Sequence, residues 1–475
     1  MNPLTNIKRI YFIGIGGIGM SALARYFNTQ GVAVAGYDKT PTGLTADLEK
    51  EGVAIHFEDD IHKIDKEATV IVYTPAIPVE HTELNYYRDN GYLVVKRSDV
   101  LNWITENAFT IAIAGTHGKT TTTSMTAHIL RHSGFGCNAF LGGIASNYNT
   151  NFWSHEKNVV VVEADEYDRS FLKLAPNIAV VTAVDPDHLD IYGTAEEVLK
   201  AFGQFTDKIK VGGTLIQKMG TEFSVDNSNK NVFSYGYNKD EASYHTQNLI
   251  VVDGSYQFDI IHPGGIMKDV VLNMGGLHNV ENATAAIAIG ITLGIEEQKI
   301  KDAVASFNGV KRRFEYKVKT ENKVLIDDYA HHPEELNALI SGVRSLYPNE
   351  KMVLISDLNN SKEFQLNYVM KQAQFNKEIY KFNKEYVTCV CILCNDKNYT
   401  SLKNILNLYF TMIKPAAPFK LCRSFDKINK YLLHNNITFE SNVFNSDVYE
   451  SCVLESNDEE EKYDIDESQS NNASM

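Results

Sequence analysis

The stretch IAIAGTHGKTTTTSMTAHIL, residues 111–130, decides the fold of the central part of this chain. It begins with an apolar run typical of a buried strand, passes through a turn bounded by glycines, and continues as a helix that starts with threonines. Gly115 and Gly118 let backbone N–H groups converge on an anion, and the helix N-terminus adds partial positive charge. Lys119 can reach the terminal phosphates of a nucleotide, and the Thr120 hydroxyl can bind Mg2+. The stretch therefore predicts a phosphate-binding loop.

This predicted loop is a shortened variant of the general P-loop pattern, because Ile113 stands where that pattern has a glycine. Its residues are Gly115, Thr116, His117, Gly118, Lys119, Thr120 and Thr121. The threonines from Thr121 to Thr123 would cap and pack the first helical turn. The alternative is a well-capped helix that binds no ligand, in which the threonines have only that structural role.

Two further polar residues predict a metal site beside the loop. Glu163 ends the apolar run at 159–162, and His188 follows the next apolar strand. The carboxyl ends of neighbouring parallel strands lie at the same edge of a sheet, where ligands bind. Together with Thr120, these side chains could hold Mg2+ against the phosphates. The alternative is that they are ordinary polar loop residues.

A second glycine-rich turn, GIGGIG, follows the first predicted strand and opens a helix. Its glycines are Gly14, Gly16, Gly17 and Gly19. Asp38 ends the next strand, about 20 residues further on, which is the layout of the dinucleotide fingerprint. The turn is consistent with an NAD-dependent dehydrogenase, with a protein that binds the diphosphate of a UDP-sugar, or with a tight turn that binds nothing.

Strands alternate with helices along most of the chain, which indicates an α/β fold built on parallel sheets. Strands are expected at 8–14, 31–40 and 68–77 in the first part. The strands of the second part are apolar throughout, as in a sheet that is buried on both faces. We expect domain boundaries near residues 107 and 310.

The overall composition excludes several classes of partner. The net charge of -15 argues against a nucleic acid or an anionic membrane, since both attract basic proteins. No apolar run approaches the roughly 18 residues of a membrane span, and the N-terminus enters a strand too early for a secretory signal. Six cysteines in 475 residues do not form a disulfide framework. These features favour a cytoplasmic protein.

The C-terminal part has a different composition. All 30 glycines lie at or before Gly342, and residues 456–475 are acidic and polar, as in a disordered tail. Cys389, Cys391 and Cys394 lie in a strand-like run. A zinc site would need a second pair of ligands, so we expect buried structural cysteines.

The chain resembles the Mur ligases over about residues 1–355. The motifs that carry the resemblance are YFIGIGGIGMSALARYF (11–27), AGTHGKTTTTSM (114–125), VEADEYDRSFL (162–172), DPDHLDIYG (185–193), GLHNVENATAA (276–286), VKRRFEY (310–316) and LIDDYAHHPEE (325–335). The resemblance implies a three-domain α/β architecture. A Rossmann-like domain (1–107) would bind UDP-N-acetylmuramate, a central P-loop domain (108–310) would bind ATP, and a third α/β domain (311–455) would be atypical or truncated.

The resemblance also implies an activity. The chain would ligate L-alanine to the lactyl carboxylate of UDP-N-acetylmuramate, using ATP and Mg2+, through an acyl phosphate. This step belongs to peptidoglycan biosynthesis, and thereby to bacterial cell wall formation, cell shape and cell division.

The resemblance assigns roles to residues by matching position. The sugar nucleotide would lie near Gly14, Gly16, Gly17, Gly19, Ser21, Asp38, Gly142 and Gly143, with the segments 74–78 and 140–144 completing that site. ATP would contact the loop from Gly115 to Thr121 together with His278, Asn279, Asn282, Arg313 and Asp327. Mg2+ would be held by Thr120, Glu163 and His188. Tyr329 and His331 would face the amino acid, and Lys119, Glu163, His188 and His331 would be the catalytic set.

The role of His331 stays open, because it is either the base that deprotonates alanine or a residue that orients its neighbours. The sequence also departs from the family after KMVLI (351–355), where the family has a stretch with arginines that hold the alanine carboxylate. Arg423 is the only arginine after Arg344, and we expect residues 356–475 to be unrelated sequence. A catalytically impaired protein that binds UDP-muramate and ATP is therefore the alternative function.

Overall fold

The computed structural model describes residues 7–185, 189–252, 254–320, 324–330, 333–347, 352–357, 387–393 and 419–422. The chain divides into two units, one formed by residues 1–351 and 381–386 and the other by residues 352–380 and 387–475. Several features named above lie outside the described residues, namely His188, His331, Cys394, Arg423 and most of residues 356–475, including the acidic tail at 456–475.

The first domain is a five-stranded parallel sheet in the order β3-β2-β1-β4-β5. Its strands are β1 (Arg9–Ile13), β2 (Ala33–Tyr37), β3 (Ala54–His56), β4 (Val70–Tyr73) and β5 (Leu93–Lys96). Its helices are α1 (Ile18–Thr29), α2 (Gly43–Lys50), α3 (Thr82–Asp89) and α4 (Arg97–Glu106). β2 and β3 lie on one side of β1, and β4 and β5 lie on its other side, so the strand order reverses at β1. This reversal puts the glycine turn that follows β1 at the switch point, where open α/β sheets bind ligands.

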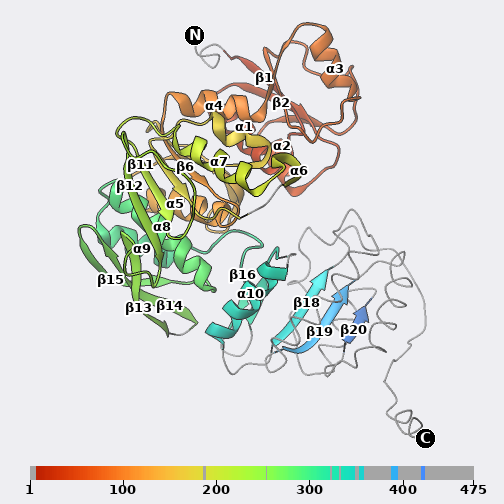
Figure 1. The fold of residues 1–475 in the computed structure, drawn as a ribbon. Coiled ribbons are helices and arrows are strands. Elements are labelled where there is room, and N and C mark those ends of the chain that lie inside the picture. The colour runs from red at the N-terminus through yellow and green to blue at the C-terminus, as the bar shows by residue number, and fades with distance from the viewer. Residues whose placement is uncertain are drawn as a thin grey trace, which may run out of the picture. The chain divides into compact units, whose positions relative to one another are not determined.

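Alternation along β1 divides the core of this domain between two faces. Ile10 and Phe12 point to the face covered by α1, where Phe27 packs 6.3 Å from Phe12 between ring centres. Tyr11 points to the opposite face, where its ring lies 5.3 Å from that of Tyr87 in α3. Figure 1 shows α3 at the outer side of this domain, away from the central helices.

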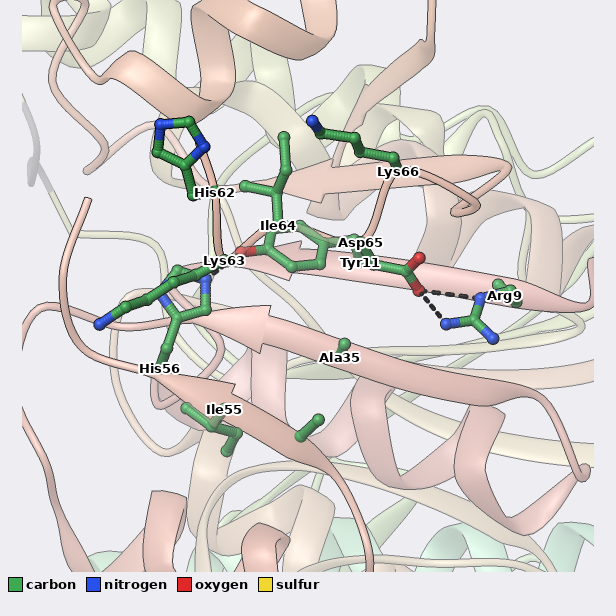
Figure 2. Close-up of a pocket in the computed structure, with 11 residues that line it drawn as sticks. Arg9, Tyr11, Ala35, Ile55, His56, His62, Lys63, Ile64, Asp65 and Lys66 are labelled. Carbon is green, nitrogen blue, oxygen red and sulfur yellow. Dashed lines mark hydrogen bonds and ion pairs between the residues drawn. The ribbon is translucent and has the colours of Figure 1, made fainter. Parts of the chain in front are cut away.

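A cavity of about 660 Å³ opens on the same face of the sheet as α3. It is lined by residues of β1, β2 and β3 and by the segment 62–66. Figure 2 shows Arg9 paired with Asp65 at one end, and His56 beside Tyr11 at the other. The Tyr11 hydroxyl lies 2.6 Å from Nε2 of His56 and donates to Oε2 of Glu83 at 2.7 Å. The side chain of Glu83 is fully buried, and this burial raises its pKa to about 7.

The buried Glu83 predicts a pH-dependent stability. Because the folded pKa of about 7 lies above the ordinary value of 4.5, the folded state binds the proton more tightly between these two pH values. The free energy of unfolding should therefore fall as the pH rises through this window. Glu83→Gln should flatten the dependence and stabilise the protein at pH 8 by on the order of 1–2 kcal/mol. Urea unfolding at pH 5 and pH 8 measures the effect.

The matched control for this prediction is Glu58→Gln, because Glu58 pairs with Lys63 on the surface and its side chain is 73% exposed. This variant should keep the wild-type pH profile. Identical profiles for the Glu83 variant and the wild type would contradict the assignment.

The central domain is a ten-stranded sheet in the order β15-β14-β13-β12-β11-β10-β6-β9-β7-β8. Its strands are β6 (Phe109–Ala114), β7 (Asn138–Ala145), β8 (Thr150–Trp153), β9 (Val159–Ala164), β10 (Ile178–Val181), β11 (Thr214–Lys218), β12 (Asn231–Tyr237), β13 (Tyr244–Val252), β14 (Ser255–His262) and β15 (Gly265–Leu272). The seven central strands, in the spatial order β13-β12-β11-β10-β6-β9-β7, pair in parallel. At the two edges, β8 pairs antiparallel with β7, and β14 and β15 pair antiparallel beyond β13.

Helices cover both faces of the central sheet (Figure 1). They are α5 (Lys119–His132), η2 (Tyr167–Lys173, a 3-10 helix), α6 (Leu189–Tyr192), α7 (Ala195–Thr206), α8 (Leu277–Thr292) and α9 (Glu297–Ser306). Ile111 and Ile113 of β6 pack with α5, α8 and α9. Ala112 and Ala114 point to the other face, where they belong to a hydrophobic cluster that also contains side chains of η2, α7 and α1. One of the hydrophobic clusters is therefore shared by the first two domains, and it packs the domain that carries the glycine turn against the domain that carries the phosphate loop.

The third part begins with an antiparallel pair, β16 (Glu315–Lys319) and β17 (Val324–Asp327), followed by α10 (Pro333–Leu346). The other unit contains β18 (Met352–Asp357), β19 (Val387–Leu393) and β20 (Phe419–Cys422), which pair in parallel in that order. The predicted α/β fold is confirmed. Within the described residues, every helix is too short or too polar to cross a lipid bilayer.

Candidate active site

The predicted phosphate loop joins β6 to α5, and its two glycines are required by space as well as by backbone angle. Gly115 has φ +137° and Gly118 has φ +82°, which are angles that side chains disfavour. A Cβ on Gly115 would lie 2.1 Å from the Thr182 hydroxyl, and one on Gly118 would lie 2.6 Å from Oδ1 of Asn282. The loop is therefore enclosed by the end of β10 and by α8, and only glycine fits at these two positions.

The end of β10 holds the loop through hydrogen bonds. The Thr182 hydroxyl donates to the carbonyl oxygen of Ala114 at 3.2 Å and also contacts the carbonyl of His117. The N–H of Thr116 donates to the carbonyl of Ala183 at 3.0 Å. The Thr116 hydroxyl donates to Asp185 at 3.1 Å. These bonds leave the loop preorganised, which lowers the entropy cost of binding an anion.

Lys119, the first residue of α5, lies within the loop. Its Nζ donates to the carbonyl of Gly115 at 2.6 Å and to Oε1 of Glu166 at 2.7 Å. The side chain of Lys119 is 16% exposed and that of Glu166 is 3% exposed. Tyr192 fixes the backbone of Glu166, because its hydroxyl donates to the Glu166 carbonyl at 2.6 Å. Our sequence analysis missed Glu166, although its position shortly after the end of β9 was a signal that could have identified it.

Thr120 and Glu163 meet as predicted for a metal site. The Thr120 hydroxyl donates to Oε2 of Glu163 at 3.3 Å, and the N–H of Gly142 donates to Oε1 at 2.8 Å. Burial raises the pKa of Glu163, although the Gly142 N–H and the charges of Lys119 and Arg313 oppose the shift. A carboxylate that burial destabilises would gain from a cation beside it.

This pair suits Mg2+, which takes oxygen ligands and is usually held by one or two carboxylates together with phosphates and water. Within the described residues, no group of three or more His, Cys, Asp or Glu side chains is arranged so that it could hold a metal ion by itself. A hydroxyl and one carboxylate are thus the donors that this part of the chain presents, which matches a cation shared with a nucleotide.

The threonines after Lys119 pack the helix and do not cap it. Gly118 is the N-cap residue of α5 and makes no side-chain cap. Thr122 is buried, and its hydroxyl donates to Asn282 of α8 at 3.2 Å. Our prediction that Thr121 to Thr123 pack the first turn is confirmed by their burial, but the prediction that they cap it was wrong, because the helix begins at Lys119 and they lie inside it.

The residues predicted for the adenine side line one end of α8. Asn282 donates to Asn279 at 3.2 Å, and Asn279 donates to the carbonyl of Gly275 at 2.7 Å. Both asparagines are buried, whereas His278 is exposed. The chain of bonds from Thr122 through Asn282 and Asn279 therefore connects the phosphate-loop helix to the start of α8.

The first glycine turn lies between the end of β1 and the start of α1, and the end of β2 holds it by hydrogen bonds. Gly14 has φ +87°, and its N–H donates to the carbonyl of Tyr37 at 2.7 Å. The side chains of Thr74 and Ile77 lie against it, so the segment 74–78 borders the turn. Asp38 accepts the N–H of Gly16 at 2.7 Å. The Asp38 carboxylate thus stabilises the turn by accepting a backbone hydrogen bond from it.

Three of the other residues predicted for the sugar nucleotide differ in burial, since Ser21 is buried, Gly143 is partly buried and Gly142 is exposed. Ser21 is fully buried and accepts a hydrogen bond from Asn151 at 2.9 Å. Gly142 borders Glu163, and a Cβ on Gly143 would lie 3.0 Å from the Thr120 methyl group. The segment 140–144 therefore reaches from the first domain to the predicted metal site.

The third part places several charged groups together. Burial raises the pKa of Asp327, and Lys317 lies 3.9 Å from its Oδ2. The guanidinium of Arg312 lies 4.9 Å from the ring centre of Tyr329. Arg313 is exposed, and its charge acts on Glu163. The structure therefore brings Arg312 and Lys317, which our sequence analysis had not selected, beside the predicted Asp327 and Tyr329.

Three protein-family models match the chain in succession. They are described as "Mur ligase family, catalytic domain" for residues 9–108, "Mur ligase middle domain" for 113–290, and "Mur ligase, glutamate ligase domain" for 312–401. The third match extends to residue 401, so our prediction that the sequence from residue 356 onward is unrelated to the family was wrong for residues 356–401.

Curated relatives named UDP-N-acetylmuramate–L-alanine ligase are similar over most of the chain. One from Cytophaga hutchinsonii is 47% identical, over 74% of this chain and 77% of the relative. One from Porphyromonas gingivalis is 48% identical, over 73% and 78% respectively. One from Flavobacterium johnsoniae is 44% identical, over 79% and 83%. The solved UDP-N-acetylmuramate-alanine ligase from Thermotoga maritima has a TM-score of 0.73 at 26% identity, over 89% of this chain and 92% of that one.

Proposed function

The chain belongs to the Mur ligase family, and on this premise we propose that it joins L-alanine to the lactyl carboxylate of UDP-N-acetylmuramate with hydrolysis of ATP. The step belongs to peptidoglycan biosynthesis and would take place in the cytoplasm. The observation that carries the proposal is the position of Lys119 inside an enclosed phosphate loop, beside the contact between Thr120 and Glu163.

The chemistry explains why such a loop is needed. A carboxylate does not react with an amine, because its leaving group would be oxide. Transfer of the γ-phosphoryl group of ATP to the lactyl carboxylate creates an acyl phosphate, which the amine of alanine attacks with release of inorganic phosphate. The protein contributes positioning and electrostatic stabilisation of the transferring group.

The residues of the loop divide this work. Backbone N–H groups between Gly115 and Lys119 would surround the phosphates, and the ammonium group of Lys119 would stabilise the charge on the transferring phosphoryl group. Thr120 and Glu163 would hold Mg2+, which supplies charge neutralisation at the phosphate oxygens when bound.

We further propose the positions of the substrates. The diphosphate of the sugar nucleotide would lie at the turn from Gly14 to Gly19, with Asp38 and Ser21 supporting the turn from behind. His278, Asn279 and Asn282 would border the adenine. Arg313 and Asp327 would approach the nucleotide from the third domain, while Tyr329 and His331 would face alanine. His188 would complete the metal site.

The active ligase is favoured over the impaired binder, because curated relatives with this activity are 44% identical or more over at least 73% of the chain. A dehydrogenase would use the first glycine turn but would leave the loop around Lys119 without a role.

The test is the release of inorganic phosphate from ATP by the full-length chain with Mg2+. We expect release to require UDP-N-acetylmuramate and L-alanine together. Binding of both nucleotides without alanine-dependent release would support the impaired binder, and reduction of a nicotinamide cofactor by a hydroxy substrate would support the dehydrogenase.

A further inference from the structure

A buried amide from the central domain holds the start of α1. Asn151 belongs to β8 and is fully buried. Its Nδ2 donates to the carbonyl of Ile18 at 2.6 Å and to the hydroxyl of Ser21 at 2.9 Å. Its Oδ1 accepts from the guanidinium of Arg25. Both the amide nitrogen and the amide oxygen of Asn151 therefore form hydrogen bonds to α1, which belongs to the other domain.

The contacts of Asn151 concentrate on the first turns of α1. This helix follows the glycine turn directly, and its N-cap residue, Gly17, provides no side-chain cap. Arg25 is itself fixed, because its guanidinium lies 2.9 Å from Glu51 and its side chain is 7% exposed. The direction of the helix N-terminus, and hence of the N–H groups that would face a diphosphate, therefore depends on an amide that the central domain supplies.

The partner strand of β8 reaches the predicted metal site. β7 and β8 pair at Phe140 and again at Ala145, but their register shifts between these residues. Within the shifted segment, the N–H of Gly142 donates to Oε1 of Glu163 at 2.8 Å, and Gly143 borders the methyl group of Thr120. One hairpin therefore holds the metal carboxylate with one strand and the start of α1 with the other.

We propose that Asn151 is a positioning residue that couples the sugar-nucleotide site to the phosphate loop through the β7–β8 hairpin. The proposal rests on the proposed function, since it takes the glycine turn as the site of UDP-N-acetylmuramate. A displacement of Glu163 on nucleotide binding is transmitted along the hairpin to Ile18 and Ser21, because the buried amide permits no alternative bonding. By linkage, each ligand changes the affinity for the other by the same factor.

The experiment measures two affinities by calorimetry in the full-length chain. UDP-N-acetylmuramate is titrated with and without a non-hydrolysable ATP analogue and Mg2+, and the analogue is titrated with and without the sugar nucleotide. Asn151→Ala leaves the Ile18 carbonyl and Arg25 without their buried partner. We expect about a tenfold or greater loss of sugar-nucleotide affinity. The affinity for the analogue alone should stay within about twofold, and the coupling factor should fall towards one.

Asn151→Asp provides the second variant, in case the alanine variant does not fold. It keeps an acceptor for Arg25 but replaces the amide that donates to the Ile18 carbonyl. We expect the same selective loss. The matched control is Asn147→Ala in the same hairpin, because Asn147 donates to Ser306 at 2.7 Å and accepts from Asn308 at 2.7 Å within the central region. This control should retain both affinities and the coupling.

Three results would overturn the proposal. One is an equal loss of both affinities in the Asn151 variants, another is a lowered melting temperature with both affinities intact, and the third is an absence of coupling in the wild type. A wild-type chain that binds the ATP analogue but not UDP-N-acetylmuramate would instead refute the proposed function.

Discussion

Replacement of Lys119 by alanine is expected to abolish ligation while UDP-N-acetylmuramate still binds. The ammonium group lies inside the phosphate loop, 2.6 Å from the Gly115 carbonyl, and no other cation is hydrogen-bonded to that carbonyl among the described residues. Its loss removes the charge that stabilises the transferring phosphoryl group, so turnover should fall by on the order of 10³-fold or more. Phosphate release measures turnover, and calorimetry with UDP-N-acetylmuramate measures the remaining site.

Lys200→Ala is the control for the loss of one positive charge. Lys200 pairs with Glu197 on the surface of α7, and its side chain is 62% exposed. Turnover of this variant should equal that of the wild type. If Lys119→Ala also abolished sugar-nucleotide binding in the absence of ATP, Lys119 would belong to the sugar-nucleotide site as well, which would contradict its assignment to the phosphate loop alone.

Gly142→Ala is expected to be nearly as damaging, although the change adds only a methyl group. A Cβ at this position would lie 2.4 Å from Oε2 and 2.5 Å from Oε1 of Glu163, so the carboxylate must move. The movement would break its contact with Thr120 and, with it, the predicted Mg2+ site. We expect turnover to fall by on the order of 10²-fold or more, with a higher requirement for Mg2+. A Mg2+ titration of phosphate release measures both effects.

The control for this substitution is Gly264→Ala in the turn between β14 and β15, where the nearest neighbour of a Cβ is the ring of His262 at 3.2 Å. This variant should keep wild-type turnover and Mg2+ dependence. Wild-type Mg2+ dependence in Gly142→Ala would show that Glu163 is not a metal ligand.

The phosphate loop was predictable because its determinants are local. Glycines at positive φ, a lysine at the start of a helix and a preceding apolar strand lie within a few residues of one another, and each has a strong preference for one structure. The same holds for the turn at Gly14 and for the parallel sheets, since alternation of strands and helices leaves few other folds. The pairing of Thr120 with Glu163 followed from the rule that strand ends meet at one edge of a sheet.

The remaining parts of the site depend on contacts that no local pattern encodes. Glu166 reaches Lys119 across 47 positions of sequence, and Gly142 reaches Glu163 across 21. Asn151 meets Ser21 across 130 positions. Such pairs arise from the packing of separate elements, so the sequence alone could not indicate that the Gly142 N–H donates to Glu163 or that a central-domain amide donates to the start of α1.

The fold class, the loop around Lys119 and the glycine turn could thus be predicted from sequence, because short-range steric preference and hydrophobic periodicity act within single elements. The contacts that pair the Lys119 ammonium with Glu166, orient Glu163 and join α1 to the central domain depend on how the elements pack together. Burial makes each of those contacts costly to leave unmade, and burial is a property of the assembled core and not of any one segment.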